Sequence, residues 1–258
     1  MLDIDERQAA IAQLVRAKKT VKALALSKRF DVSVETIRKD LLDLQDQGVL
    51  VRVHGGAKLR SGGTESAYDR RRSVNTSAKE SIALAAAEGI EDGSTIYLDY
   101  GTTTFALAAA LVRTDRKLRV LTNALPIVNE LATSDSIETL VLGGILRPNE
   151  RSLSGPLAER ALDSVYMDTG FFGCAGIDAA AGITNIHALE CAASQKAMSH
   201  CSSVVLLADS DKWGTIASNK LADFEQIDVL ISESQPVGAL ATALDTAGVS
   251  IITPEDHQ

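Results

Sequence analysis

The sequence predicts an α/β protein in which an N-terminal winged helix-turn-helix precedes a mostly parallel sheet with helices on both faces. Residues 1–60 contain three helical patterns followed by a short alternating segment, the order of elements in a winged helix-turn-helix. From about residue 80, strand-like apolar runs alternate with helical patterns. This alternation is typical of parallel sheets, and nearly continuous apolar strands indicate burial on both faces.

The first two helices of the N-terminal part are separated by a polar turn. Apolar residues between Ile11 and Val15 share one helical face, and a second helical pattern runs from Val21 to Phe30. Thr20 lies where the N-cap of the second helix is expected. Only two residues separate that helix from Ser33, an N-cap position for a third helix, so the turn suits a helix-turn-helix.

The third helix carries an apolar stripe and is expected to end at Gly48. Its stripe consists of Val34, Ile37, Leu41 and Leu44. The segment 49–59 then alternates in polarity and contains a Gly-Gly pair, which predicts a small hairpin or wing.

The C-terminal part contains six strand-like runs with helical stretches between them. Strands are expected at 95–99, 118–123, 138–142, 169–173, 203–208 and 229–232, and helices at 105–112, 127–132, 157–164 and 188–200. We therefore expect a winged helix-turn-helix domain at 1–60, a linker at 61–75 and a larger domain at 76–258.

Charge is distributed unevenly between these parts. The net charge of the chain is −8. Residues 1–60 carry 12 Lys/Arg and 8 Asp/Glu, a balance of +4, while residues 61–258 carry 14 and 26, a balance of −12. A basic N-terminal part followed by an acidic remainder is expected when only the N-terminal part contacts a phosphate backbone. Chance clustering of surface lysines gives the same asymmetry.

Composition argues against several other classes of protein. The chain begins with acidic residues where a signal peptide is basic, and its apolar runs are shorter than a membrane span, so we expect a soluble, cytoplasmic protein. Three cysteines without a C-x-x-C pair indicate buried reduced thiols. Four scattered histidines form no H-E-x-x-H motif. We expect no metal centre and no cofactor.

The third helix is the candidate DNA-reading element. Its polar side lies opposite the apolar stripe, so its N-terminal half suits a major groove. An ordinary solvated helix face is the alternative, but the preceding helix, the tight turn and the wing favour DNA binding. The predicted DNA-binding residues are Ser33, Glu35, Thr36, Arg38, Lys39, Arg52 and His54.

Polar and glycine-rich turns follow five of the expected strands. Ligands of open α/β sheets bind at the carboxyl ends of strands, and Gly101–Thr104, opening a helix, offers N–H groups and hydroxyls to an anion such as phosphate. Each turn alone is explained by a strand-to-helix connection, but five at one edge favour a ligand site. Lys212 is either a phosphate partner or a solvated lysine. For the carboxylates of Asp99, Glu190 and Asp209, binding of sugar hydroxyls is favoured over acid–base catalysis.

At these positions the sequence resembles the DeoR family of bacterial sugar-metabolism repressors, from about Glu6 to the C-terminus. The resemblance covers Arg7 to Ile11, then Ser33-Val34-Glu35-Thr36-Ile37-Arg38-Lys39-Asp40-Leu41, Gly48, and Arg52-Val53-His54-Gly55-Gly56-Ala57. In the second part it covers Asp99-Tyr100-Gly101-Thr102-Thr103, Thr122-Asn123, residues 143–148, 155–159, 176–178 and 207–212.

The resemblance implies that residues 76–258 sense an effector with a fold similar to ribose-5-phosphate isomerase. It also implies that a phosphorylated sugar or related metabolite lowers affinity for a DNA operator. Together with the strand-end argument, the expected effector-binding residues are Asp99, Gly101, Thr102, Thr103, Thr104, Asn123, Gly143, Gly144, Arg147, Gly176, Glu190 and Lys212. The sequence departs from the family at Tyr100, where a small residue is common, and at Gln195, where lysine is usual.

The resulting hypothesis is a non-enzymatic repressor that binds a palindromic or repeated operator as a homo-oligomer, dimer or tetramer. The alternative is an enzyme like a sugar-phosphate isomerase with an accessory DNA-binding domain. Constitutive DNA binding without a ligand is a third possibility. Residues 64–80, with Arg70-Arg71-Arg72 and Lys79, are either a relay between the domains or a solvated basic surface.

Overall fold

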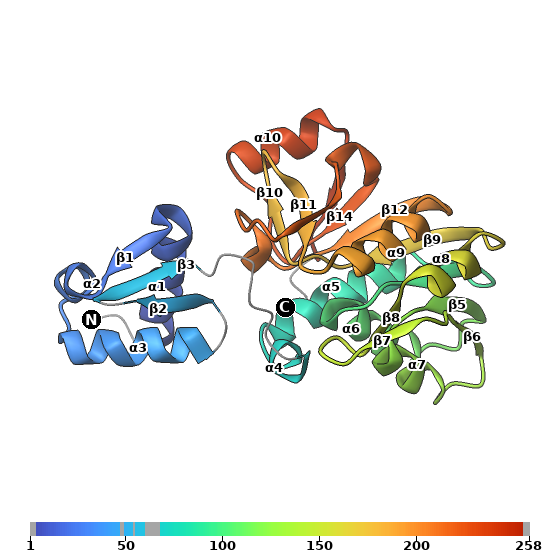
Figure 1. Cartoon of the computed structure of the whole chain (residues 1–258), viewed down its shortest axis with the longest axis horizontal. Helices are drawn as coiled ribbons and strands as arrows, with labels where there is room; N and C mark the ends of the chain where they lie inside the picture. Colours follow the sequence, from blue (N-terminus) through green and yellow to red (C-terminus); the bar gives the residue numbers. More distant parts are fainter. Residues whose placement is uncertain (1–3, 47–48, 54, 60–67, 255–258) are drawn as a thin grey trace. The chain divides into compact units, whose positions relative to one another are not determined.

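The computed structural model describes residues 4–46, 49–53, 55–59 and 68–254, and the chain divides into two compact units, residues 1–66 and 67–258 (Figure 1). Each unit has buried apolar residues of its own. One cluster lies wholly in the first unit, and two clusters lie in the second.

The first unit contains three helices and a three-stranded antiparallel sheet of order β1-β3-β2. Its elements are α1 (Ile4–Lys18), β1 (Thr20–Lys22), α2 (Ala23–Phe30), α3 (Val34–Asp46), β2 (Leu50–Val53) and β3 (Gly56–Leu59). The predicted stripe of the third helix is confirmed, because Ile37, Leu41 and Leu44 are buried in the core of this unit. The predicted wing is also confirmed as the β2–β3 hairpin.

Of the two helix N-caps predicted for this unit, one is wrong and one is confirmed. Thr20 does not cap α2; it begins β1, which pairs with β3, and α2 starts at Ala23. Val21 is buried while its two strand neighbours are exposed, so the strand places one apolar side chain on the core. Ser33 does cap α3, accepting a hydrogen bond from the Thr36 N–H at 3.0 Å.

The second unit is built on a seven-stranded sheet of order β15-β14-β12-β9-β4-β5-β6, in which every adjacent pair is parallel. The six expected strands are confirmed, and β15 was not predicted. The strands are β4 (Thr95–Leu98), β5 (Leu118–Thr122), β6 (Ile137–Val141), β9 (Met167–Phe172), β12 (Cys201–Leu207), β14 (Val229–Ile231) and β15 (Ser250–Ile252).

Helices cover both faces of this sheet, as predicted. Alternating strand residues contribute to different cores: Ile96 and Leu98 pack with α5, α6 and α7, whereas Tyr97 packs with α8, α9 and α10. Figure 1 shows α5 and α6 side by side. The helices are α5 (Thr76–Glu88), α6 (Thr102–Leu111), α7 (Leu125–Leu131), α8 (Pro156–Leu162), α9 (Ala188–Met198) and α10 (Ala239–Thr246).

Several short elements that were not predicted surround the sheet. They are α4 (Tyr68–Arg72), the antiparallel hairpin β7 (Ile145–Arg147) and β8 (Ser152–Ser154), and an antiparallel sheet of β10 (Gly176–Asp178), β11 (Gly182–Asn185) and β13 (Asn219–Ala222). Two 3₁₀ turns, η1 (Ser210–Lys212) and η2 (Phe224–Gln226), complete the unit. Among the described residues, no helix is both long and apolar enough to cross a membrane.

Candidate functional site

Helix α3 is held on the first unit by a buried ion pair. The Arg7 guanidinium of α1 donates to both carboxylate oxygens of Asp40, with Nε–Oδ2 at 2.7 Å and Nη2–Oδ1 at 3.0 Å. Gln8 adds a hydrogen bond to Asp43 at 3.1 Å. These contacts fix the side of α3 that faces α1, so the opposite side is available to a partner.

The predicted DNA-binding residues lie at the start of α3, in its N-terminal half and on the wing. Ser33, Glu35, Arg38 and Lys39 are exposed, and Thr36 is half-buried and bonded to Ser33. Arg38 makes only a surface ion pair with Glu35, at 3.0 Å, which a phosphate can displace. Exposed Arg52 is on β2, and its N–H donates to Gln45 of α3. His54 lies outside the described residues.

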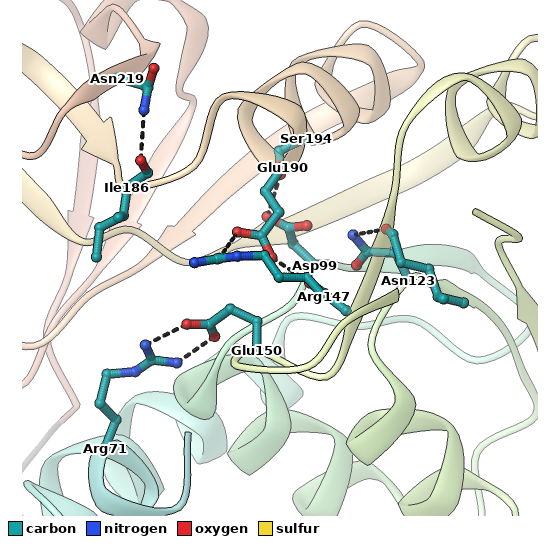
Figure 2. Close-up of polar contacts among 11 residues, drawn as sticks. Arg71, Asp99, Asn123, Arg147, Glu150, Ile186, Glu190, Ser194 and Asn219 are labelled. Atoms are coloured by element: carbon teal, nitrogen blue, oxygen red, sulfur yellow. Dashed lines mark hydrogen bonds and ion pairs between the residues drawn. The ribbon is translucent and has the colours of Figure 1, made fainter. Parts of the chain in front are cut away.

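In the second unit, Asp99, Arg147 and Glu190, three predicted effector-binding residues, lie together at the carboxyl edge of the sheet. The carboxylate of Glu190, in the first turn of α9, accepts hydrogen bonds from Arg147 at the end of β7 and from Ser152 at the start of β8 (Figure 2). The Glu190 side chain is 1% exposed and that of Arg147 is 16% exposed. Ser152 was not predicted, because its part follows from the hairpin register that pairs it with Arg147.

Asp99 lies directly after β4 and is fully buried. Ser194, one turn beyond Glu190 on α9, donates to its Oδ2 at 2.7 Å, and the Tyr97 hydroxyl donates to its Oδ1 at 3.3 Å. Burial is the main cause that raises the pKa of Asp99 to about 7; the Ser194 hydrogen bond opposes the rise, and the nearby Glu190 carboxylate adds to it. Asp99 therefore changes charge near neutral pH.

Asn123, after β5, lies against the same hairpin. Its amide nitrogen donates to the Leu153 carbonyl at 3.2 Å, and the Leu153 N–H donates to the Asn123 carbonyl at 2.8 Å. The side-chain oxygen Oδ1 is buried and has no hydrogen-bond partner among the residues that the structure describes. An unsatisfied buried acceptor is unusual and would suit a ligand hydroxyl.

Two predicted glycine regions shape the backbone around this cluster. Gly101 precedes α6 with φ 143°, and Thr102, Thr103 and Thr104 form its buried first turn. The Thr104 hydroxyl donates to the Gly101 carbonyl at 3.2 Å. A helix N-terminus of this kind offers unpaired N–H groups to an anion.

Gly143 and Gly144 connect β6 to the hairpin in different environments. Gly144 has φ 139°, and a Cβ there would lie 2.6 Å from the Ser154 carbonyl oxygen. A Cβ on Gly143 would meet nothing within 4 Å. Gly144 is therefore required for close packing of the backbone, whereas Gly143 is not.

Gly176 and Lys212 belong to a second group of residues around η1. A Cβ on Gly176 would lie 2.2 Å from the Thr215 carbonyl, so only glycine fits beside the segment that follows η1. Lys212 is half-buried, and the structure gives its ammonium no hydrogen bond or ion pair among the described residues.

Charged residues that the strand-end argument missed lie next to both groups. Arg71 of α4 forms a two-point ion pair with buried Glu150, in the turn of the β7–β8 hairpin (Figure 2). Lys79 is buried and donates to the carbonyls of Arg71 and Val74. Burial lowers the pKa of Lys79 to about 8. No motif predicts the Arg71–Glu150 pair, because the two residues are 79 positions apart in the chain.

A separate cavity of about 530 Å³ lies among α4, α6, α7 and the hairpin. Arg72 and Phe105 line it, with the guanidinium 4.2 Å from the ring centroid. None of the predicted effector-binding residues lines this cavity. In the same unit the three cysteines are free, Cys191 being buried and the others half-buried. The described residues contain no group of three or more His, Cys, Asp or Glu suited to a metal ion.

Each of the two units matches the model of a known protein family. The model of the DeoR C terminal sensor domain matches residues 74–234, and that of the DeoR-like helix-turn-helix domain matches residues 7–62. The chain belongs to the DeoR family. This DeoR-family chain therefore combines a DNA-binding unit with a sensor unit, as transcriptional regulators of the family do.

Curated relatives match nearly the whole DeoR-family chain. The putative aga operon transcriptional repressor of Escherichia coli O157:H7 is 33% identical over 96% of this chain and 93% of its own length. The glycerol-3-phosphate regulon repressor of Escherichia coli (strain K12) is 30% identical over 90% of this chain and 91% of its own length. The chain is also similar to ribose 5 phosphate isomerase A from Neisseria gonorrhoeae, at 16% identity, a TM-score of 0.41 and 53% coverage of each chain.

Proposed function

We propose that this DeoR-family chain represses a carbohydrate-metabolism operon and is released from its operator by a phosphorylated sugar or related metabolite. The observation that carries the proposal is the strand-end cluster, in which Asp99, Arg147 and Glu190 come together from three separate elements. The carboxyl edge of a parallel sheet is where open α/β proteins bind ligands. Residues 76–258 are the sensor in this proposal, residues 1–60 bind DNA, and residues 61–75 connect them.

The cluster offers complementary groups to a sugar phosphate. The N-terminus of α6 at Gly101–Thr104, the Arg147 guanidinium and the Lys212 ammonium would bind the phosphate. The free Oδ1 of Asn123 and the carboxylates of Asp99 and Glu190 would bind hydroxyls. In this arrangement the ligand phosphate competes with Glu190 for Arg147, so the ion pair opens when the effector binds.

On the DNA side, α3 enters a major groove and the wing contacts the backbone. Arg38 and Lys39 provide positive charge, while Ser33, Thr36 and Arg52 add contacts to phosphates or base edges. Two copies of α3 in a homo-oligomer, a dimer or tetramer, would read the two halves of a palindromic or repeated operator. The names of the relatives, which refer to a glycerol-3-phosphate regulon and an aga operon, support this class of target.

The test is a titration of labelled DNA from upstream of the protein's own coding region, at fixed and stated salt, with a panel of sugar phosphates that includes glycerol 3-phosphate. We expect specific binding that one metabolite weakens. Lys212→Met, which removes a phosphate partner without breaking a described ion pair, should bind the DNA but resist release. Arg119→Met, which breaks an exposed Arg–Glu pair elsewhere in the unit, should behave as wild type.

Two results would contradict the proposal. Absence of specific DNA binding under every condition would remove the repressor function. Turnover of a sugar phosphate by the purified protein, abolished in Asp99→Asn, would favour the alternative function, that of an enzyme similar to a sugar-phosphate isomerase.

A further inference from the structure

Helix α4 is the first described element after the segment 60–67, so in sequence it is the sensor-unit end of the connection to the DNA-binding unit. Arg70 and Arg72 of this helix are exposed, but Arg71 and the following Lys79 are not simple surface cations. Arg71 binds Glu150, and Lys79 binds the backbone carbonyls of Arg71 and Val74.

The first attachment of α4 is to the β7–β8 hairpin. Arg71 binds Glu150 through both carboxylate oxygens, and the Glu150 side chain is 3% exposed, so this carboxylate has been removed from water. Glu150 lies in the same turn as Arg147, and the Arg151 N–H donates to the Arg147 carbonyl at 2.8 Å. A shift of Arg147 therefore moves the partner of Arg71.

The second attachment is to η1. Asn75, which follows α4 with φ 53°, donates from its amide nitrogen to Asp211 Oδ2 at 2.9 Å. Asp211 is the chain neighbour of Lys212. Between the two attachments, the buried ammonium of Lys79 binds the carbonyls of Arg71 and Val74 and so fixes the C-terminal end of α4 to the turn that carries Asn75.

We propose that residues 68–75 form a clasp, through Arg71–Glu150 and Asn75–Asp211, that couples occupancy of the effector site to the DNA-binding unit. This inference rests on the proposed function. When a phosphate takes Arg147 from Glu190, the hairpin turn moves, the Arg71–Glu150 pair opens and α4 loosens. A ligand shifts such an equilibrium only through different contacts in the two states, and the alternative partners of Arg147 provide them.

The clasp is tested first without ligand or DNA, by hydrogen exchange on the full-length chain. Glu150→Gln keeps the side-chain shape but removes the charge that holds Arg71. We expect faster exchange in the hairpin, in residues 68–79 and also in residues 209–214, which the Asn75–Asp211 hydrogen bond joins to the end of α4. The amides of Lys212 and Trp213, bonded to Asp209 and Ser210, report on the last segment.

Two further variants make this result specific. Asn75→Gly tolerates the positive φ and removes the hydrogen bond to Asp211. In the double variant Glu150→Gln/Asn75→Gly, exchange in residues 209–214 should be no faster than in Asn75→Gly alone. Arg70→Ala, an exposed neighbour of Arg71, should leave exchange in both loops unchanged. A response to Glu150→Gln confined to the hairpin would overturn the clasp.

The second measurement is operator affinity without effector. Glu150→Gln should imitate bound effector and weaken the operator complex by about fivefold or more, the lower end of typical allosteric coupling. The charge swap Arg71→Glu with Glu150→Arg should restore it. Wild-type affinity in Glu150→Gln would refute the clasp as a regulator. If the wild type itself binds no upstream DNA, the proposed function fails, and hydrogen exchange alone decides whether the clasp joins the two loops.

Discussion

Replacing Asp40 with asparagine should strongly destabilise the DNA-binding unit while leaving the stability of the sensor unit unchanged. The Arg7 and Asp40 side chains are 7% and 3% exposed, so the substitution leaves a buried guanidinium without its counter-charge. Removing one partner of a buried ion pair costs about 3–5 kcal/mol. Domains are stable by roughly 0.05–0.15 kcal/mol per residue, which gives on the order of 3–10 kcal/mol for a unit of this length. The substitution therefore removes a large part of that stability.

Thermal unfolding of the full-length chain, followed by circular dichroism, measures the effect. Asp40→Asn should lower the transition of the first unit and abolish operator binding, with the sensor transition unchanged. Glu35→Gln breaks an ion pair on the same helix whose side chains are 60% and 81% exposed, so its stability should change by about 1 kcal/mol or less. Arg7→Met with Asp40→Leu should recover much of the stability. An unshifted transition in Asp40→Asn would refute this reasoning.

Three further predictions follow from the geometry of the two units. Arg38→Ala should weaken operator binding and reduce the slope of log affinity against log salt concentration by about 1, the loss expected for one phosphate contact. Metabolite binding, measured by calorimetry, should be unchanged. Because the pKa of Asp99 is raised from 3.8 to about 7, the folded state holds a proton that the unfolded chain loses. Stability should therefore fall as pH rises between these values, and melting curves of Asp99→Asn should lack this decline. Gly144→Ala should destabilise the sensor by about 2 kcal/mol or more in denaturant titrations, while Gly143→Ala should be nearly neutral, because only Gly144 combines a positive φ with a backbone contact.

The parts of the fold that could be predicted are those with a periodic signal in one segment. The stripe of α3 and the apolar runs of β4, β5 and β12 each predict an element without reference to any other part of the chain. The strands β1, β7 and β8 have only three residues each, and their existence depends on pairing partners, as β1 depends on β3. Such elements have no local pattern to detect.

The same distinction applies to the candidate site. Polar residues at strand ends could be predicted to share an edge, and Asp99 lies there. Arg147 and Glu190, which lie beside it, were expected there only from the resemblance to the DeoR family. The direct partners Ser152 and Ser194 were missed, because nothing near a serine in the sequence distinguishes it from many others. The roles of the predicted DNA-binding and effector-binding residues stay predictions until the variants above are measured.

The strand order of the sensor sheet has a consequence for how the protein is synthesised. The central strands β4 and β9 are neighbours, with Ile96 paired to Thr169, so the middle of the sheet closes only after most of the chain has left the ribosome. The strand pairs described in the first unit lie between Thr20 and Leu59. The DNA-binding unit can therefore complete its fold early. A chain truncated before β9 would carry a DNA-binding unit that no effector controls.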